Sequence, residues 1–281
     1  PNTKLVYTET LGNPKLDFVD IAAVADVAHA HGLPLVVDNT LTPILCRPID
    51  HGADIVIYSL TKYFSGNGTA MGGAVVDSGK FDWTNGKFPD FTEPSPGYHG
   101  LRYSETFGPA AFIVRARVEG LRDIGACLSP TNSFLIIQGL ETLALRIKQS
   151  SQSALEIARW LQQHPAVEWV HYPGLEQDEH HEICKRYLDG GFGCIITFGL
   201  KGGYEAAKSF ADHTKLFRIV ANLGDTKSLV IHPSSTTHRQ LSPEQQVSAG
   251  VTPDLVRLSI GLEDIEDLKA DIEQAILEAT R

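Results

Sequence analysis

"SLTKYFSGNG", residues 59–68, sets a lysine among hydroxyl side chains and ahead of two glycines, directly after an apolar run. That run, "HGADIVIYSL" at 51–60, is rich in Val and Ile and predicts a buried strand. Lys62 is therefore expected where the strand ends, at the edge of a sheet. Ligands of open α/β sheets bind outside the carboxyl ends of the strands, so this position indicates a functional lysine.

Short apolar segments on both sides of this strand extend the predicted sheet. Residues 5–10, 33–39 and 72–77 ("LVYTET", "LPLVVDN", "GGAVVD") are further strand candidates. Between the first two, Asp17 is the predicted N-cap of a helix that ends at Gly32. Because the strand candidates are continuous Val/Ile-rich runs without strict alternation, they favour a parallel sheet covered on both faces.

Residues 78–110 are rich in Gly, Pro and aromatic residues and show no periodicity. Long ordered loops in compact domains are more often functional than idle, so one interpretation is a lid over the site. On that interpretation Tyr98 and His99 are candidate substrate contacts.

The C-terminal half predicts a second α/β unit. Helical spacing sets in after residue 110 and continues until Pro165, and five strand candidates follow, "VEWVHYP", "CIITFGL", "FRIVANLG", "SLVIHP" and "LVRLSIGL". Their order and their separation by short helices favour antiparallel pairing. We place the domain boundary inside the long helical stretch, which gives a large domain at 1–145 and a small domain at 146–281.

Composition narrows the classes of partner. The chain has 281 residues, with 42% hydrophobic and 21% charged side chains, and these values are typical of a globular protein. A net charge of -10 disfavours nucleic-acid binding, which needs clustered Lys and Arg. No apolar run approaches the roughly 20 residues that span a bilayer. Small-molecule chemistry is the class that remains.

Two further features concern the compartment and the chain's extent. The four cysteines lie far apart without CxxC pairing, which favours a reducing, cytoplasmic compartment over a disulfide framework. The chain begins at Pro1 and its only methionine is Met71, so we expect residues upstream that belong to the same protein. No metal site is predicted, because "EHHEIC" lacks the HExxH spacing.

Asp38 and Lys62 together indicate a specific chemistry. Each alone has an ordinary interpretation, a turn residue and a surface lysine. Both are expected at the carboxyl edge of one sheet, where a desolvated amine has a lowered pKa and can form a Schiff base. A carboxylate beside it can keep a pyridine nitrogen protonated, and these are the two requirements of pyridoxal phosphate. Ser59 and Thr61 are candidate donors to the cofactor phosphate.

Several motifs carry a resemblance to a known family. "ETLGNP", "VVDN", "DIVIYSLTKYFSGNG", "HPSSTTH" and "VRLSIGLED" resemble the Cys/Met-metabolism family of pyridoxal-phosphate enzymes, over essentially the whole chain. The resemblance implies an α/β fold of the aspartate-aminotransferase type, fold type I, with a mostly parallel sheet in the large domain and a smaller C-terminal α/β domain. "SPTNSFLIIQGLETLALR" and the long segment after residue 78 are most similar to O-acetylhomoserine sulfhydrylases. Part of the family's cofactor pocket would then lie upstream of residue 1.

Roles for individual residues follow from the resemblance. It implies that Lys62 is the Schiff-base lysine, which also moves protons among substrate carbons, and that Asp38 pairs with the pyridine nitrogen. Ser59 and Thr61 match the family's phosphate contacts. Asn13, in "GNP", matches a contact near the cofactor's phenolic oxygen or the substrate.

Arg257 is the predicted substrate-binding residue. Strand alternation in "LVRLSIGL" puts Arg257 and Ser259 on the face opposite the apolar side chains. The resemblance implies that Arg257 binds the amino-acid carboxylate in a bidentate fork. It also matches Ser228 with a residue that orients that carboxylate or the lysine, and Thr237 with one that supports the site.

The implied reaction is a γ-replacement in methionine biosynthesis, in which O-acetylhomoserine and sulfide, or a thiol, give homocysteine, or methionine, and acetate. Two alternatives stay open at this point. The first is a cystathionine γ-synthase, cystathionine γ-lyase or methionine γ-lyase, and the second is a truncated, non-catalytic paralogue. The acyl group and the preferred thiol are not specified by the sequence. The resemblance further implies a homotetramer, a dimer of dimers with shared active sites.

Overall fold

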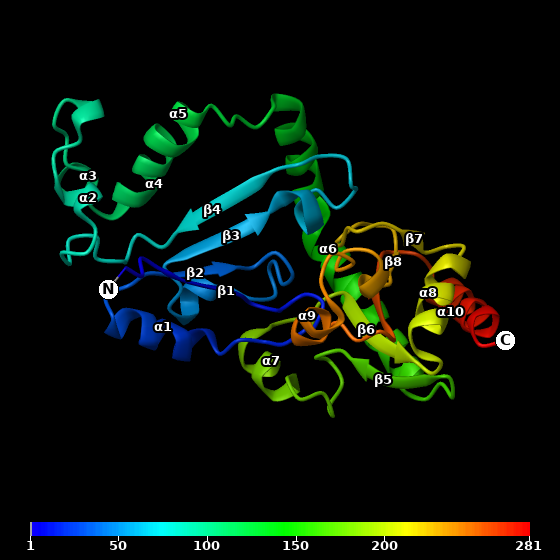
Figure 1. The fold of residues 1–281 in the computed structure, drawn as a ribbon. Helices are drawn as coiled ribbons and strands as arrows, with labels where there is room; N and C mark the ends of the chain where they lie inside the picture. Colours follow the sequence, from blue (N-terminus) through cyan, green and yellow to red (C-terminus); the bar gives the residue numbers. More distant parts are fainter. Residues whose placement is uncertain (1) are drawn as a thin grey trace.

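Two β-sheets and one long helix between them organise the chain, as the computed structural model of residues 2–281 shows (Figure 1). The first sheet has the order β1-β2-β3-β4. Its strands are β1 (Val6–Glu9), β2 (Leu35–Asp38), β3 (Ile55–Ser59) and β4 (Gly73–Asp77). The first three are parallel and β4 is antiparallel to β3, so the sheet is mostly parallel, as predicted.

The register of the first sheet aligns the carboxyl ends of its parallel strands. Glu9 is paired with Asp38, and Asp38 with Ile57. Lys62 follows β3 in a single π-helical turn, η2 (Leu60–Phe64). The carboxylate of Asp38 and the amine of Lys62 therefore belong to the same edge of the sheet, as the sequence predicts.

Helix α1 (Ile21–Ala30) connects β1 and β2 and begins later than predicted. Its N-cap is Asp20, whose Oδ1 accepts a hydrogen bond from the Ala23 N–H at 3.1 Å. Asp17 instead closes a tight turn, because its backbone oxygen accepts from the Gly12 N–H at 2.8 Å. The prediction of Asp17 as the cap is wrong because the chain is still turning at that residue.

The segment after β4 forms short helices at the far end of the sheet. They are α2 (Pro89–Thr92), η3 (Pro96–Tyr98), α3 (Tyr103–Phe107), η4 (Gly108–Ala110), α4 (Ala111–Arg115), η5 (Ala116–Leu121) and α5 (Arg122–Ile124). Antiparallel β4 runs from beside Ser59 back to beside Ile55, so the chain leaves it at the amino ends of β1–β3. Figure 1 shows α2 and α3 beyond that end of the sheet.

The predicted lid is therefore wrong for the Lys62 site of the same chain. The Tyr98 hydroxyl donates to the backbone oxygen of Val118 at 2.7 Å and is held on η5. His99 directly follows it as the C-cap of η3, between α2 and α3. An aromatic cluster explains why this segment is ordered, since Trp83 stacks on Phe91 with ring centroids 4.5 Å apart.

The second sheet follows helix α6 (Pro130–Gln162), and its order is β5-β6-β9-β8-β7. It contains the five predicted strands, β5 (Val167–His171), β6 (Ile195–Leu200), β7 (Arg218–Ile219), β8 (Leu229–Ile231) and β9 (Leu255–Ser259). All pairs are antiparallel except β7 with β8. The predicted domain boundary after residue 145 falls inside α6 and stays a prediction.

The core of the second half lies between its sheet and its helices. Helices α8 (Gly203–His213) and α10 (Ile265–Ala279) pack on one another and, with α6, cover the sheet; their apolar side chains share one buried cluster with it. The remaining elements are η1 (Pro48–His51), α7 (His181–Tyr187), η6 (Pro233–Ser235) and α9 (Pro243–Ser248). Within residues 2–281, no helix is long and apolar enough to cross a membrane.

We predict that Asp271→Ala destabilises the second half of the chain. Asp271 is buried in α10 and accepts from the backbone N–H groups of Lys215, Leu216 and Phe217 at 2.8 to 3.0 Å. Removing it leaves buried donors without partners, so the free energy of unfolding should fall by about 3 kcal/mol. Asp212→Ala, an exposed change on α8, should stay within about 0.5 kcal/mol of wild type. Equal denaturation midpoints for both variants would contradict this account.

Candidate active site

Lys62 extends from a turn that the sequence shapes locally. The Gly66 N–H bonds to the Lys62 backbone oxygen at 2.9 Å, and Gly66 has a φ of 69°, a value that favours glycine. Lys62 itself, with φ -87° and ψ -124°, departs from helical geometry inside η2. Its amine reaches the second half of the chain, where Nζ donates to Oδ1 of Asn222 at 2.5 Å.

The surroundings of this amine favour its neutral form. Burial lowers the pKa of Lys62, and the positive charge of Arg257 lowers it further. A neutral amine is the nucleophile in Schiff-base chemistry and also the form that can accept a proton. The predicted lowering of the Lys62 pKa therefore has two physical causes in the structure.

Arg257 lies on β9, in the middle of the second sheet, with a side chain only 6% exposed. Its Nη1 donates to Oδ1 of Asn13 at 3.1 Å, and its Nη2 donates to the backbone oxygen of Asn222 at 2.7 Å. Its Nε is buried without a hydrogen-bond partner among residues 2–281. Burial lowers the pKa of Arg257 to about 10, so the guanidinium stays charged at neutral pH.

Among the described residues, no carboxylate oxygen lies within 4.0 Å of the Arg257 guanidinium. A buried guanidinium with an unsatisfied donor is costly unless an anion completes it. Its planar fork matches a carboxylate in two parallel hydrogen bonds. Arg257 is thus suited to bind the carboxylate of an amino acid, close to the Lys62 amine.

Asn222 is the residue that the sequence analysis missed. Its side-chain oxygen accepts from Lys62 and its backbone oxygen accepts from Arg257, so one residue ties both cations together. The run "FRIVANLG" predicts a strand that includes Asn222, but β7 ends at Ile219. No local signal marks Asn222, because its partner Lys62 lies 160 residues away in sequence.

Asp38 lies at the same edge of the first sheet as Lys62, and its carboxylate accepts hydrogen bonds from other residues. Its Oδ1 accepts from the Thr40 N–H at 2.9 Å, and its Oδ2 accepts from the Tyr7 hydroxyl at 3.3 Å. Burial, followed by the charge of Asp38, raises the pKa of Tyr7 to about 12. The same two causes, in the same order, raise the pKa of Glu9, the neighbour of Asp38 in the register.

Ser59 and Thr61, the two predicted phosphate ligands, differ in the number of hydrogen bonds that their hydroxyl groups form. The Thr61 hydroxyl donates to the Gly72 backbone oxygen at 3.3 Å and accepts from its N–H at 3.1 Å. The Ser59 backbone N–H donates to Oγ1 of Thr40 at 2.8 Å, and within residues 2–281 the Ser59 hydroxyl forms no hydrogen bond. Both residues lie at the entrance to the lysine-bearing turn, and their phosphate role stays a prediction.

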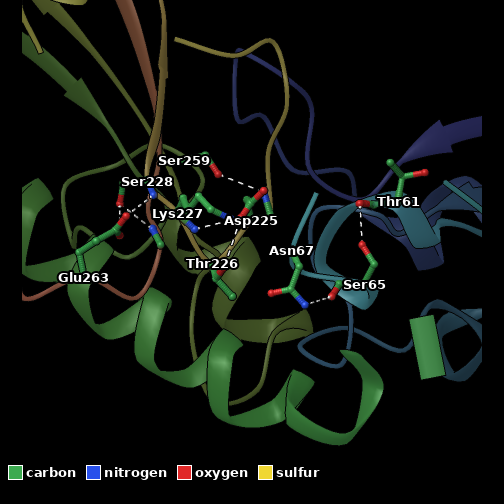
Figure 2. Close-up of polar contacts among 11 residues, drawn as sticks. Thr61, Ser65, Asn67, Asp225, Thr226, Lys227, Ser228, Ser259 and Glu263 are labelled. Atoms are coloured by element: carbon green, nitrogen blue, oxygen red, sulfur yellow. Dashed lines mark hydrogen bonds and ion pairs between the residues drawn. The ribbon is translucent and has the colours of Figure 1, made fainter. Parts of the chain in front are cut away.

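Within residues 2–281, neither Ser228 nor Thr237 forms a hydrogen bond with Lys62 or Arg257. The buried Ser228 hydroxyl donates to Glu263 at 2.8 Å and accepts from the Gly261 N–H at 2.8 Å, as Figure 2 shows for the glutamate. These bonds join two segments of the second half. Exposed Thr237 bonds to Nδ1 of His238 at 2.9 Å. Their predicted substrate roles stay predictions without a supporting contact.

A lysine of lowered pKa at the carboxyl edge of an α/β sheet, linked through Asn222 to a buried arginine, is an arrangement suited to Schiff-base chemistry. The profile of the "Cys/Met metabolism PLP-dependent enzyme" family matches residues 1–277. The chain belongs to this family, so the predicted family resemblance and the pyridoxal-phosphate cofactor are confirmed.

Individual relatives narrow the comparison. O-acetyl-L-homoserine sulfhydrylase of Leptospira meyeri is 54% identical over 98% of this chain and 64% of its own length. O-acetyl-L-homoserine sulfhydrylase 1 of Thermus thermophilus is 50% identical over 98% of this chain and 66% of its own length. Homocysteine synthase of Schizosaccharomyces pombe is 50% identical over 98% of this chain and 65% of its own length. The chain thus spans a little under two thirds of these relatives.

A solved structure shows the same fold. The O-acetylhomoserine (thiol)-lyase described from Campylobacter jejuni superposes with a TM-score of 0.94 at 43% identity, covering 98% of this chain and 66% of that one. It carries N'-pyridoxyl-lysine-5'-monophosphate. The predicted α/β fold of type I is therefore confirmed.

We predict that Arg257→Gln raises the pKa of Lys62. The positive charge of Arg257 disfavours the protonated amine, so its removal should shift the pH midpoint of Lys62 reductive methylation upward by about half a unit. Arg239→Gln removes an exposed arginine and serves as the matched control. A midpoint that moves equally in both variants, or in neither, would contradict the electrostatic coupling.

Proposed function

We propose that the protein catalyses a γ-replacement in which O-acetylhomoserine and sulfide give homocysteine and acetate. The observation that carries the proposal is the Lys62–Asn222–Arg257 arrangement, which sets an amine of lowered pKa beside a buried guanidinium with an unsatisfied Nε. The names of the relatives support this choice of reaction within the family.

The residues of the chain fit the cofactor of the family. Lys62 offers an amine of lowered pKa for the cofactor carbonyl. Asp38 offers the carboxylate oxygen Oδ2, whose only hydrogen bond within residues 2–281 is a 3.3 Å contact from Tyr7. Ser59 and Thr61 would hold the phosphate, and Asn13 would lie near the phenolic oxygen or the substrate. When bound, pyridoxal phosphate supplies an electron sink for charge that develops at the substrate α carbon.

Arg257 would position the substrate. Within residues 2–281 its Nε has no partner, and each Nη carries a second N–H beyond the one given to Asn13 or to the Asn222 backbone, so these donors would serve the substrate carboxylate. Charge-assisted bidentate bonds fix orientation as well as position. The α carbon of the substrate is thereby placed within reach of the Lys62 amine.

Lys62 would then move protons. Its amine is neutral more often than that of an exposed lysine, because burial and Arg257 both lower its pKa. A neutral amine beside the substrate can accept the proton of the α carbon and return it at another carbon. Asn222 Oδ1, at 2.5 Å, is the acceptor that holds the resulting ammonium group.

Assembly and compartment belong to the same proposal. We infer a small amino-acid substrate and sulfide as partners, a homotetramer with shared active sites, and a cytoplasmic location. Large apolar side chains are exposed on α6 and on α5, which precedes it, and this supports burial of the surface against another copy of the chain. They are Phe134, Ile137 and Leu145 on α6, and Ile124 on α5. Three of the four cysteines are free and buried, which supports a reducing compartment.

The full-length protein, given O-acetylhomoserine and sulfide, should produce homocysteine and acetate in equal amounts. Without sulfide it should release little keto acid and ammonia, because replacement needs the second substrate. Lys62→Ala should abolish product formation in both cases. Keto acid and ammonia as the main products, with or without sulfide, would assign the protein to the lyases. Absence of any product from cofactor-loaded protein would indicate a non-catalytic paralogue.

We predict that Arg257→Lys weakens substrate binding more than it slows turnover. Lysine keeps the charge but loses the planar fork, so KM for O-acetylhomoserine should rise about a hundredfold. Steady-state kinetics on the full-length protein measures this, with Arg239→Lys as the control for an exposed arginine. An unchanged KM would remove Arg257 from the substrate-binding site.

A further inference from the structure

The lysine turn, defined here as residues 60–66, packs directly against helix α6. At the contact the helix has Gly139, and a Cβ built there would overlap Phe64 O and meet Ser65 O at 2.5 Å. The backbone of the turn therefore touches the backbone of the helix, with no side chain between them. Any side chain at residue 139 would displace the turn.

Arg146 lies two helical turns further along α6 and reaches back to the same contact. Its Nη2 donates to Gly139 O at 2.7 Å and makes a longer contact to Phe64 O at 3.4 Å. Its Nε donates to Oγ1 of Thr142 at 3.1 Å, which fixes the side chain along the helix. The guanidinium covers Gly66, where a Cβ would overlap Nη1.

The charge of Arg146 has no ion pair that would explain its burial. Its side chain is 9% exposed, and within residues 2–281 no carboxylate oxygen lies within 4.0 Å of its nitrogen atoms. Burial lowers the pKa of Arg146, while Cys194 and Asp225 act in the opposite direction. A buried guanidinium without an ion pair is costly, so the hydrogen bonds to Gly139 O and Phe64 O must offset that cost.

The other side of the lysine turn is held by residues 222–228. The Thr226 N–H donates to Gly66 O at 2.7 Å, and a Cβ at Gly224 would meet the Tyr63 ring and its backbone nitrogen at 2.8 Å. Figure 2 shows this segment opposite Thr61, Ser65 and Asn67. The turn is thus confined between α6 and the segment that contains Asn222.

We propose that Arg146 is a positioning residue for Lys62. Its guanidinium fixes the backbone of residues 64–66 against α6, and this holds the lysine turn at the depth where Nζ meets Asn222 and is withdrawn from water. The role rests on the proposed function of Lys62 as the reactive amine. The positioning role concerns the location of the Lys62 amine and is the same for any reaction that the cofactor supports.

The test measures the pH midpoint of Lys62 reductive methylation in the cofactor-free, full-length protein, by peptide mapping. The midpoint reports the solvation and charge environment of Nζ, and Arg257 is the charged group that acts on it. Accessibility changes the plateau rate but not the midpoint. Arg146→Met preserves length and apolar packing, and Lys148→Met removes an exposed cation of the same helix as a matched control.

The proposal expects the midpoint to rise by about one pH unit in Arg146→Met, because the released turn exposes Nζ to water, and to stay unchanged in Lys148→Met. Arg146→Lys should show an intermediate rise, since an ammonium cannot reproduce the fork, and it decides the question should the Met variant not fold. A wild-type midpoint in a folded Arg146 variant would overturn the positioning role.

The same preparations separate this inference from the proposed function. Wild-type protein given pyridoxal phosphate and borohydride should carry the pyridoxyl label on Lys62. Absence of that label, with the midpoint shift still present in Arg146→Met, would refute the proposed function and leave the positioning role standing. A label on Lys62 with no midpoint shift in Arg146→Met would support the proposed function and refute the positioning role of Arg146.

Discussion

One polar residue joins the reactive groups contributed by the two sheets. The side-chain oxygen of Asn222 accepts from the Lys62 amine of the first half, and its backbone oxygen accepts from Arg257 on the central strand of the second. Both cations are thereby held to a common reference point. The spacing between amine and guanidinium depends on this residue and on the elements that fix its position.

Those elements act mainly through close backbone contacts. Gly139 and Gly224 let α6 and residues 222–228 approach the lysine turn, and hydrogen bonds to Phe64 O and Gly66 O hold it there. Such confinement withdraws Lys62 from water, and burial is the larger of the two causes that lower its pKa. The electrostatics of the site is therefore a consequence of packing, with the charge of Arg257 as a second contribution.

Prediction from sequence succeeded where the signal is local. Within residues 2–281 each of the nine strands falls in a segment predicted as a strand, and Asp38, Lys62 and Arg257 occupy strands or strand ends that those segments define. It failed where several local solutions compete. Asp17 and Asp20 are both plausible caps, and only the turn at Gly12 decides between them. The direction of β4 cannot be inferred from its composition, and the mistaken lid at Tyr98 and His99 followed from that.

The sequence by itself determined where most strands lie, the α/β class, the family motifs and the likeness of Lys62 to a Schiff-base lysine, because each depends on the order of nearby residues. Only the tertiary structure decided that Asn222 lies against Lys62, 160 residues away, and that Arg146 reaches Phe64 across 82 residues. The physical reason is that hydrogen bonding and desolvation act over a few ångströms in space. Sequence separation carries no information about such distances until the chain has folded.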